Sequence, residues 1–370
     1  MTGSDTPPYG GDASGVSELD RAAVDRYCCQ YLQLETHLDY PDGQLLKRPG
    51  IQEEIFNRVF SGQSYTPKNT RFQLRALKEL VARIQASISD DESDDYEVSD
   101  ELMDHLGELM SQPLMPEADE AQQKCLVTYH MSLLQSTAVI RILENRSLIS
   151  AGGTTGLRTW EAALHLGQYL CANSHLVAGK RVLELGAGTG YLSILGAKCL
   201  GADHVIASDG AEEVVDNLAD NFTLNGLEWD YTSSRRTRIS PKLLKWGHAL
   251  VGTEEPEWIG GQRIDLVIGA DITYDQSVIP SLVSTVMELL GLFPEADIIV
   301  AATQRNIETL SAFRGACAQN RLRVKELEFS AQEQQSVLDL RGQPCRPLTP
   351  FYSTRVPILI FHITGSDTVI

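Results

Sequence analysis

Three glycines and a carboxylate near the middle of the chain have the spacing of a nucleotide-binding turn. Residues 181–190, RVLELGAGTG, begin with a short apolar run that predicts a buried strand of a parallel sheet. Gly186, Gly188 and Gly190 follow it and predict a tight turn that no side chain blocks. Asp209 ends the next apolar run, where an acidic group can accept hydrogen bonds from both hydroxyls of a ribose.

The spacing of these residues indicates which cofactor the turn would bind. A dinucleotide fingerprint reads G-x-G-x-x-G, but its third glycine position holds the bulky Tyr191. Glu184, two residues before Gly186, instead gives the pattern E-L-G-x-G-x-G of S-adenosylmethionine (AdoMet) methyltransferases. AdoMet carries a cationic sulfonium and ammonium and no phosphate, so it favours carboxylates and carbonyl groups. We predict AdoMet as the cofactor, with Glu184 among the binding residues. The alternatives are a structural turn and a nicotinamide-dependent oxidoreductase.

Further candidates follow later strands, because open α/β sheets bind ligands beyond the carboxyl ends of their strands. Trp246 can stack on an adenine ring or pack in the core. Asp271 and Tyr274 stand in the stretch DITY after the predicted strand 264–269. Enzymes that methylate base amines commonly carry two prolines here, and their absence makes a nucleobase the weaker prediction. A lysine amine, with a pKa of about 10.4, needs acceptors and exclusion of water to react. The alternative is that Asp271 only orders its loop.

The elements that position these residues alternate between strands and helices, which predicts a parallel sheet. The expected strands and helices are listed together here: strands at 181–185, 205–207, a region ending near 243, 264–269, 297–303, 322–329 and 356–363; helices at 191–200, 214–225, 278–290 and 307–320. No helix separates the last two strands, so they should pair as an antiparallel hairpin. The predicted fold is therefore α/β, a class I methyltransferase with a seven-stranded, mostly parallel sheet.

The chain before this domain has a different pattern. Residues 1–16 are small and polar and predict a disordered tail. Residues 17–130 predict a small helical domain, with helices at 51–60 and 71–88, and residues 131–370 form the methyltransferase domain. We also expect a hairpin of 138–143 with 147–150, and a helix from Trp160 that Thr159 caps. Trp160 is a candidate lid over the cofactor.

Composition excludes several other functions. The 31 basic and 50 acidic residues give a formal net charge of -19, which argues against direct nucleic-acid binding and suits a basic protein substrate. No apolar run is long enough to span a membrane, and the N-terminus lacks the features of a signal peptide. The seven cysteines show neither CxxC nor Cys/His clustering, which predicts reduced thiols, a cytoplasmic location and no metal site.

The chain resembles the eukaryotic seven-β-strand protein-lysine methyltransferases, in particular the branch that acts on translation elongation factor 2. The resemblance covers residues 128–370 and is carried by these motifs: GTTGLRTWEAAL (153–164), VLELGAGTG (182–190), Ser208-Asp209, NFTLNG (221–226), ADITY (270–274) and TQRNIET (303–309).

The resemblance implies an AdoMet-dependent enzyme whose partner is a protein substrate, elongation factor 2. It implies that AdoMet contacts Trp160, Gly186, Ala187, Gly188, Asp209, Trp246 and the backbone at Ala270. It implies that Asp271 and Tyr274 stand at the methyl-acceptor entrance as catalytic residues. The alternatives are methylation of another protein or a small amine, and an AdoMet-binding scaffold that has lost catalysis.

Overall fold

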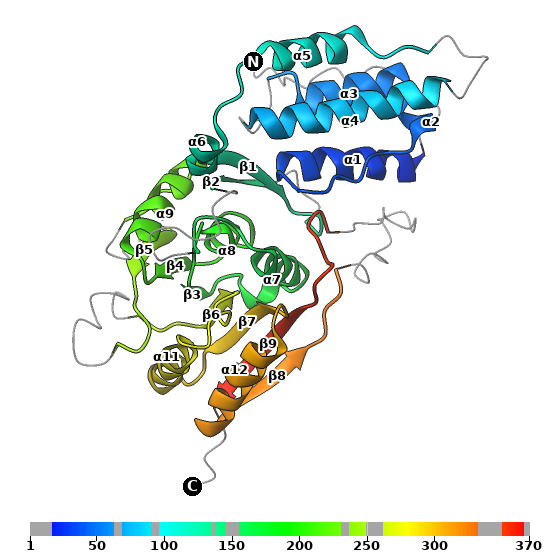
Figure 1. The fold of residues 1–370 in the computed structure, drawn as a ribbon. Coiled ribbons are helices and arrows are strands. Elements are labelled where there is room, and N and C mark those ends of the chain that lie inside the picture. The colour runs from blue at the N-terminus through cyan, green and yellow to red at the C-terminus, as the bar shows by residue number, and fades with distance from the viewer. Residues whose placement is uncertain are drawn as a thin grey trace, which may run out of the picture. The chain divides into compact units, whose positions relative to one another are not determined.

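The computed structural model divides into two compact units, Met1–Leu114 and Met115–Ile370 (Figure 1). The residues that it describes are 17–62, 69–89, 96–134, 138–145, 155–230, 237–248, 250, 262–331 and 350–365. The predicted tail, residues 1–16, lies outside this range.

The first unit is helical, as predicted. It contains α1 (Glu18–Leu32), α2 (Gly43–Leu46), α3 (Pro49–Val59), α4 (Thr70–Ser89) and α5 (Asp100–Ser111). Ser17 starts α1 because its side chain and that of Asp20 each accept a hydrogen bond from the other's backbone N–H, at 3.2 and 3.1 Å. The ring of Tyr31 packs against Phe60 and Phe72, with centroids 5.0 and 5.2 Å apart. The unit thus has an aromatic core of its own.

The second unit is built on the predicted seven-stranded sheet. Its strands are β3 (Arg181–Leu185), β4 (His204–Asp209), β5 (Ile239–Leu243), β6 (Leu266–Ala270), β7 (Asp297–Thr303), β8 (Leu322–Leu327) and β9 (Ile358–Gly365). Their order in the sheet is β5-β4-β3-β6-β7-β9-β8. The strands β3 to β7 are parallel, and β9 runs antiparallel to both β7 and β8. The class I methyltransferase fold and its antiparallel C-terminal hairpin are therefore confirmed.

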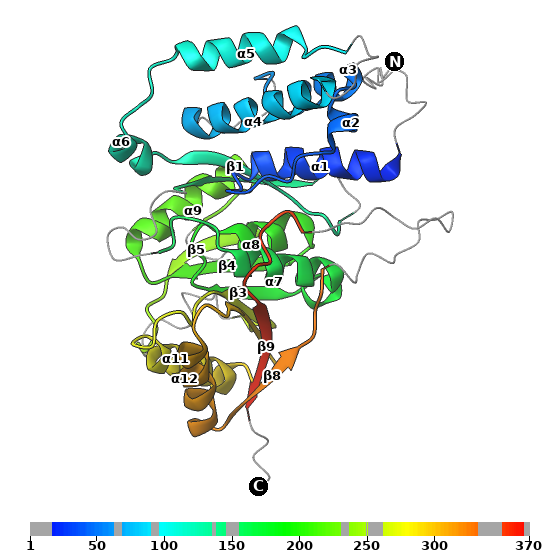
Figure 2. The ribbon, with the colours of Figure 1, turned by 45° about the vertical axis from the view of Figure 1, so that its right-hand side comes forward.

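Helices cover the sheet on two sides (Figures 1 and 2). They are α7 (Glu161–Ala172), α8 (Tyr191–Ile194), which continues as a π-helical turn (Leu195–Cys199), α9 (Glu212–Leu224), α11 (Ile279–Leu292) and α12 (Ile307–Gln319). Both views place α7, α8 and α9 on one side and α11 and α12 on the other. None of the helices in the described part of the chain is long and apolar enough to cross a membrane.

The first strand of the predicted hairpin before α7 is present and pairs with a strand that precedes it in the chain. The strand β2 (Val139–Glu144) pairs antiparallel with β1 (Cys125–His130), after the short helix α6 (Glu117–Gln122). Residues 147–150, the expected partner, lie outside the described residues. The second unit begins at Met115 and includes α6 and β1, whereas the sequence predicted a domain from residue 131.

Candidate active site

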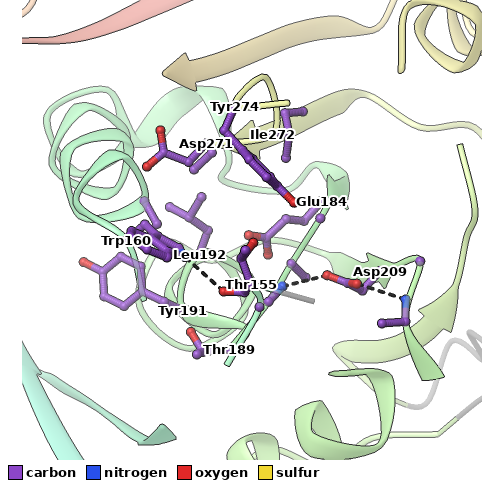
Figure 3. Close-up of a pocket in the computed structure, with 18 of the residues that line it drawn as sticks. Thr155, Trp160, Glu184, Thr189, Tyr191, Leu192, Asp209, Asp271, Ile272 and Tyr274 are labelled. Atoms are coloured by element: carbon purple, nitrogen blue, oxygen red, sulfur yellow. Dashed lines mark hydrogen bonds between the residues drawn. The ribbon is translucent and has the colours of Figure 1, made fainter. Parts of the chain in front are cut away.

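A cavity of about 370 Å³ lies at the carboxyl ends of the central strands (Figure 3). Its size falls in the range of small-molecule sites. All of the residues predicted for the site line it, and they are Trp160, Glu184, Gly186, Ala187, Gly188, Asp209, Trp246, Ala270, Asp271 and Tyr274. Figure 3 shows Trp160 and Asp271 on one side of the cavity, Asp209 on the other, and Glu184 between them.

The glycine turn leaves its backbone open to a ligand. Gly186 and Gly188 have φ of 66° and 53°, a left-handed conformation that favours glycine. A Cβ at Gly186 would lie 2.7 Å from Cγ2 of Ile272 and 3.4 Å from Cζ2 of Trp246. A Cβ at Gly188 would lie 3.3 Å from the carbonyl oxygen of Gly156. Side chains at these two positions would therefore push against the cavity wall at Ile272 and against the backbone at Gly156.

Asp209 holds the glycine turn to the end of β4. Its Oδ2 accepts a hydrogen bond from the Gly188 N–H, and its Oδ1 accepts one from the Ala211 N–H, both at 3.1 Å. Burial raises the pKa of Asp209 from its ordinary value, and hydrogen bonds from backbone N–H groups lower it in part. Each carboxylate oxygen keeps lone pairs that can accept hydrogen bonds from ribose hydroxyls.

Glu184 is fully buried at the base of the cavity. Its Oε2 accepts a hydrogen bond from the Ser193 hydroxyl. Burial raises the pKa of Glu184 to about 8, so near neutral pH the carboxyl group is mostly protonated. A cationic ligand in the cavity would favour its charged form.

Beside the glycine turn, the ring of Trp246 offers a flat apolar surface to the cavity. Trp246 follows β5 and packs against the core below the cavity. Its Nε1 is buried and has no hydrogen-bond partner among the described residues. A flat ring that stacks on an indole fits this side chain. Together with the glycine turn and three carboxyl groups, this surface fits AdoMet, a cation with an adenine ring.

Asp271 and Tyr274 lie at one edge of the cavity. Asp271 has φ of 51°, and its carboxylate accepts hydrogen bonds from the backbone N–H and the hydroxyl of Thr303, at 2.7 and 2.9 Å. Burial raises its pKa from the ordinary value. Tyr274 is 57% exposed, so its ring stands at the mouth of the cavity. The two hydrogen bonds from Thr303 show that Asp271 orders its loop, which was the alternative that the sequence left open.

Trp160 forms part of the wall beside Asp271. Its indole Nε1 donates a hydrogen bond to the carbonyl oxygen of Thr155 at 3.0 Å. The guanidinium groups of Arg158 and Arg305 lie over its ring, at 4.5 and 4.7 Å from the centroid. These positively charged groups attract the ring faces and keep the indole in place.

Thr159 does not cap α7, contrary to the prediction. Trp160 is the N-cap residue and makes no side-chain cap hydrogen bond. The Thr159 hydroxyl instead forms a hydrogen bond of 2.7 Å with the Thr189 hydroxyl. The backbone N–H of Thr159 donates to the Glu144 carboxylate at 2.8 Å. These contacts fix the 155–160 loop to the glycine turn and to β2. Four residues that line the cavity were not predicted as site residues from the sequence: Thr155, Arg158, Thr159 and Thr189. The sequence pointed to them only through the many glycines and threonines before α7.

Comparisons with known proteins agree on one family. A sequence profile of that family, described as Lysine methyltransferase, matches residues 140–316. The protein-lysine N-methyltransferase EFM3 of Chaetomium thermophilum is 52% identical to this chain over 91% of the chain and 96% of the relative. EFM3 of Saccharomyces cerevisiae is 32% identical over 71% of the chain and 76% of the relative. Human EEF2KMT, also a protein-lysine N-methyltransferase, is 31% identical over 67% and 70%.

Proposed function

The chain belongs to the lysine methyltransferase family, and from this premise we propose that it methylates a lysine of translation elongation factor 2. As a member it is an AdoMet-dependent protein-lysine N-methyltransferase, and its substrate is a protein. The choice of elongation factor 2 is supported by the motif resemblance and by the relatives named EEF2KMT. The proposed location is the cytoplasm, because the cysteine spacing suits reduced thiols.

The observation that carries the proposal is the meeting of two motifs in one cavity. The glycine turn with Asp209 lines one side, and Asp271 with Tyr274 lines the other. The first set suits a ribose, and the second suits an incoming amine. We propose that Asp209, Trp246, Trp160, Glu184, the turn at Gly186, Ala187 and Gly188, and the Ala270 backbone hold AdoMet, and that Asp271 and Tyr274 are the catalytic residues.

When bound, AdoMet supplies an electrophilic methyl group on a positively charged sulfur. The residues of the chain then have to bring a neutral lysine amine into line with that group. The Asp271 carboxylate attracts the lysine ammonium and accepts a hydrogen bond from it, and the proton leaves to water through the open mouth at Tyr274. The Trp160 indole keeps water from the inner part of the cavity.

Methylation of the purified factor tests this proposal. The enzyme is incubated with tritiated AdoMet and either purified elongation factor 2 or a cell lysate. Labelling of a lysine of the factor is the expected result. If the purified factor stays unlabelled and a different protein band in the lysate is labelled, the substrate is that other protein. The assignment to the lysine methyltransferase family would then still stand.

A further inference from the structure

Arg305 is held in place just outside the lining of the cavity. It lies between the end of β7 and the start of α12, where its N–H donates to the carbonyl oxygen of Thr303 at 2.8 Å. The neighbouring Gln304 N–H donates to the carbonyl oxygen of Pro357 at 2.8 Å. On the other side, the Asn306 side chain caps α12 by accepting from the first backbone N–H groups. The backbone of Arg305 is therefore fixed on both sides.

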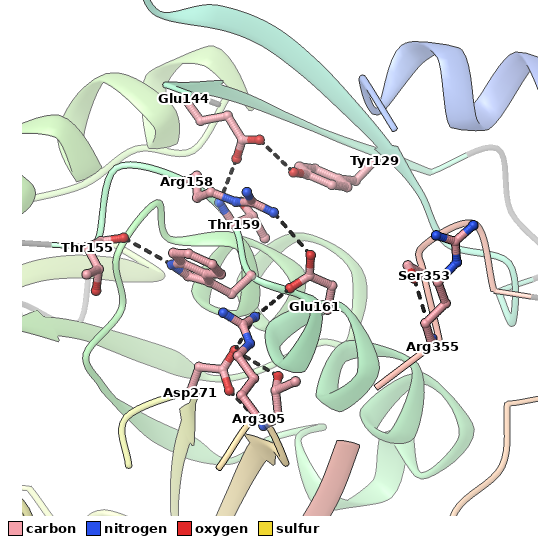
Figure 4. Close-up of polar contacts among 12 residues, drawn as sticks. Tyr129, Glu144, Thr155, Arg158, Thr159, Glu161, Asp271, Arg305, Ser353 and Arg355 are labelled. Carbon is pink, nitrogen blue, oxygen red and sulfur yellow. Dashed lines mark hydrogen bonds and ion pairs between the residues drawn. The ribbon is translucent and has the colours of Figure 1, made fainter. Parts of the chain in front are cut away.

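The guanidinium group of Arg305 contacts two segments that are far apart in the sequence, the start of α7 and the turn after β6 (Figure 4). Its Nη2 lies 2.9 Å from Oε2 of Glu161 at the start of α7, and 3.7 Å from Oδ2 of Asp271 after β6. Its Cζ lies 4.7 Å from the centroid of the Trp160 ring. The other oxygen of Glu161 pairs with Arg158, whose guanidinium also lies over Trp160.

The ion pair of Arg305 with Glu161 is too exposed to contribute much to the stability of the fold. The side chain of Arg305 is 47% exposed and that of Glu161 is 28% exposed, and exposed ion pairs contribute little to folding. Asp271, by contrast, is only 13% exposed and lies in the cavity wall. What Arg305 does join is the Trp160 ring and the Asp271 carboxylate, which stand next to each other on one side of the cavity.

We propose that Arg305 is a positioning residue for methyl transfer, which fixes the Trp160 ring and the Asp271 carboxylate relative to each other. The proposal rests on the proposed function, because it assigns the acceptor side to Asp271. A planar guanidinium can stack on the indole and pair with both carboxylates at once, which a lysine ammonium cannot. Moving the amine by about 1 Å from the reactive position can lower the rate of methyl transfer about a hundredfold.

The positive charge of Arg305 gives a second way to test its role, through the pKa of Asp271. Among the charged groups that act on Asp271, Arg305 lowers its pKa, while Glu161 on α7 raises it, and burial raises it most. Removing Arg305 removes the positive charge that lowers this pKa, so the pKa of Asp271 should rise further. The acid limb of the pH–rate profile should then move to higher pH, which a purely structural change would not cause.

Three variants of the full-length enzyme test the proposal. Arg305→Met removes the charge and the planar group, and Arg305→Lys keeps only the charge. Arg314→Met is the matched control, because Arg314 is also 47% exposed, pairs with Glu326 at 2.6 Å and lies 4.9 Å from the Phe361 ring centroid, outside the cavity lining. The measurements are AdoMet affinity, kcat and KM for the protein substrate, and kcat against pH.

We expect Arg305→Met to lower kcat about tenfold or more and to move the acid limb upward, with AdoMet affinity within about threefold of the wild type. Arg305→Lys should keep the wild-type acid limb and recover only part of kcat. Arg314→Met should match the wild type in all measurements. Wild-type kcat and an unmoved acid limb in Arg305→Met would overturn the proposal, and so would an equal loss in Arg314→Met.

Failure of the substrate assignment gives a different result. If the wild type leaves purified elongation factor 2 unlabelled, the assignment to that factor is wrong. The same variants are then compared on the protein band that the wild type labels in a lysate. Equal labelling by Arg305→Met and the wild type on that band would overturn the role of Arg305, and a selective loss would support it.

Discussion

At the residue scale, the contacts of Asp271 decide how its role can be tested. Because Thr303 donates two hydrogen bonds to the carboxylate, Asp271→Ala removes both the charge and the order of the loop. Asp271→Asn removes the charge but keeps an oxygen that accepts from the Thr303 N–H, and its amide N–H can donate to the Thr303 hydroxyl oxygen. The two variants separate loop order from charge.

We expect Asp271→Asn to lower single-turnover methylation of elongation factor 2 by about a hundredfold, the lower end for general-base assistance. Its AdoMet affinity should stay close to that of the wild type. Tyr274→Phe, at the exposed mouth, should lose less. Calorimetric titration with AdoMet runs in parallel: wild-type turnover would remove Asp271 from the chemistry, and loss of AdoMet binding would assign it to the cofactor.

Glu184 gives a prediction about pH. Its pKa rises on folding from 4.5 to about 8. A carboxyl group raised in this way stabilises the fold fully below its unfolded pKa and loses that contribution as the pH rises through its folded pKa. The thermal midpoint of the unliganded wild type should therefore fall more between about pH 6 and pH 8 than that of Glu184→Gln. Parallel midpoint curves for the two proteins would contradict the raised pKa.

The sequence could identify only part of the site. Glu184, the glycines and Asp209 were predictable because one strand, one turn and the end of the next strand bring them together with fixed spacing. The pairing of Arg305 with Glu161 was not predictable, because it joins the loop after β7 to the start of α7, and their relative position depends on how the helix packs on the sheet. Local patterns hold no information on such contacts.

At the element scale, the glycine turn can be tested against a turn of the same conformation. Gly186 and Gly201 have φ of 66° and 72°, but a Cβ at Gly201 meets no described atom within 4 Å. A side chain in this conformation costs about 1–2 kcal/mol, so Gly186→Ala and Gly201→Ala should each lower stability.

Only Gly186→Ala should also weaken AdoMet binding, because its Cβ would lie 2.7 Å from Ile272 in the cavity wall. We expect a loss of tenfold or more, about 1.4 kcal/mol, for Gly186→Ala and an unchanged affinity for Gly201→Ala. Calorimetric titration of both variants checks this. Equal affinities would mean that the cofactor does not approach the turn at Gly186.

The order of the strands shows what element patterns predict and what they do not. The apolar runs predicted the strands, and the missing helix before β9 predicted its antiparallel pairing with β8. That β9 also pairs with β7, with Phe361 opposite Val300, depends on contacts between distant segments. The pairing of β1 with β2 likewise joins segments whose contact the sequence pattern did not predict.

At the scale of the whole molecule, the cofactor cavity belongs to one unit. Its lining runs from Thr155 to Ser281, all within Met115–Ile370. None of the described residues of the first unit lines the cavity, and this unit has its own core around Tyr31. We therefore expect the first unit to serve recognition of the protein substrate and not binding of AdoMet.

A fragment of residues 115–370 tests this division. Starting at 115 keeps the β1–β2 pair, whose Glu144 accepts a hydrogen bond from the Thr159 N–H and so holds the loop before α7. The fragment should bind AdoMet within about threefold of the full chain, because every lining residue is present. Its kcat/KM for elongation factor 2 should fall about tenfold or more, since lost substrate contacts raise KM. Methylation at the full-length rate would show that the first unit has another role, and weakened AdoMet binding in a folded fragment would show that the two units are not independent.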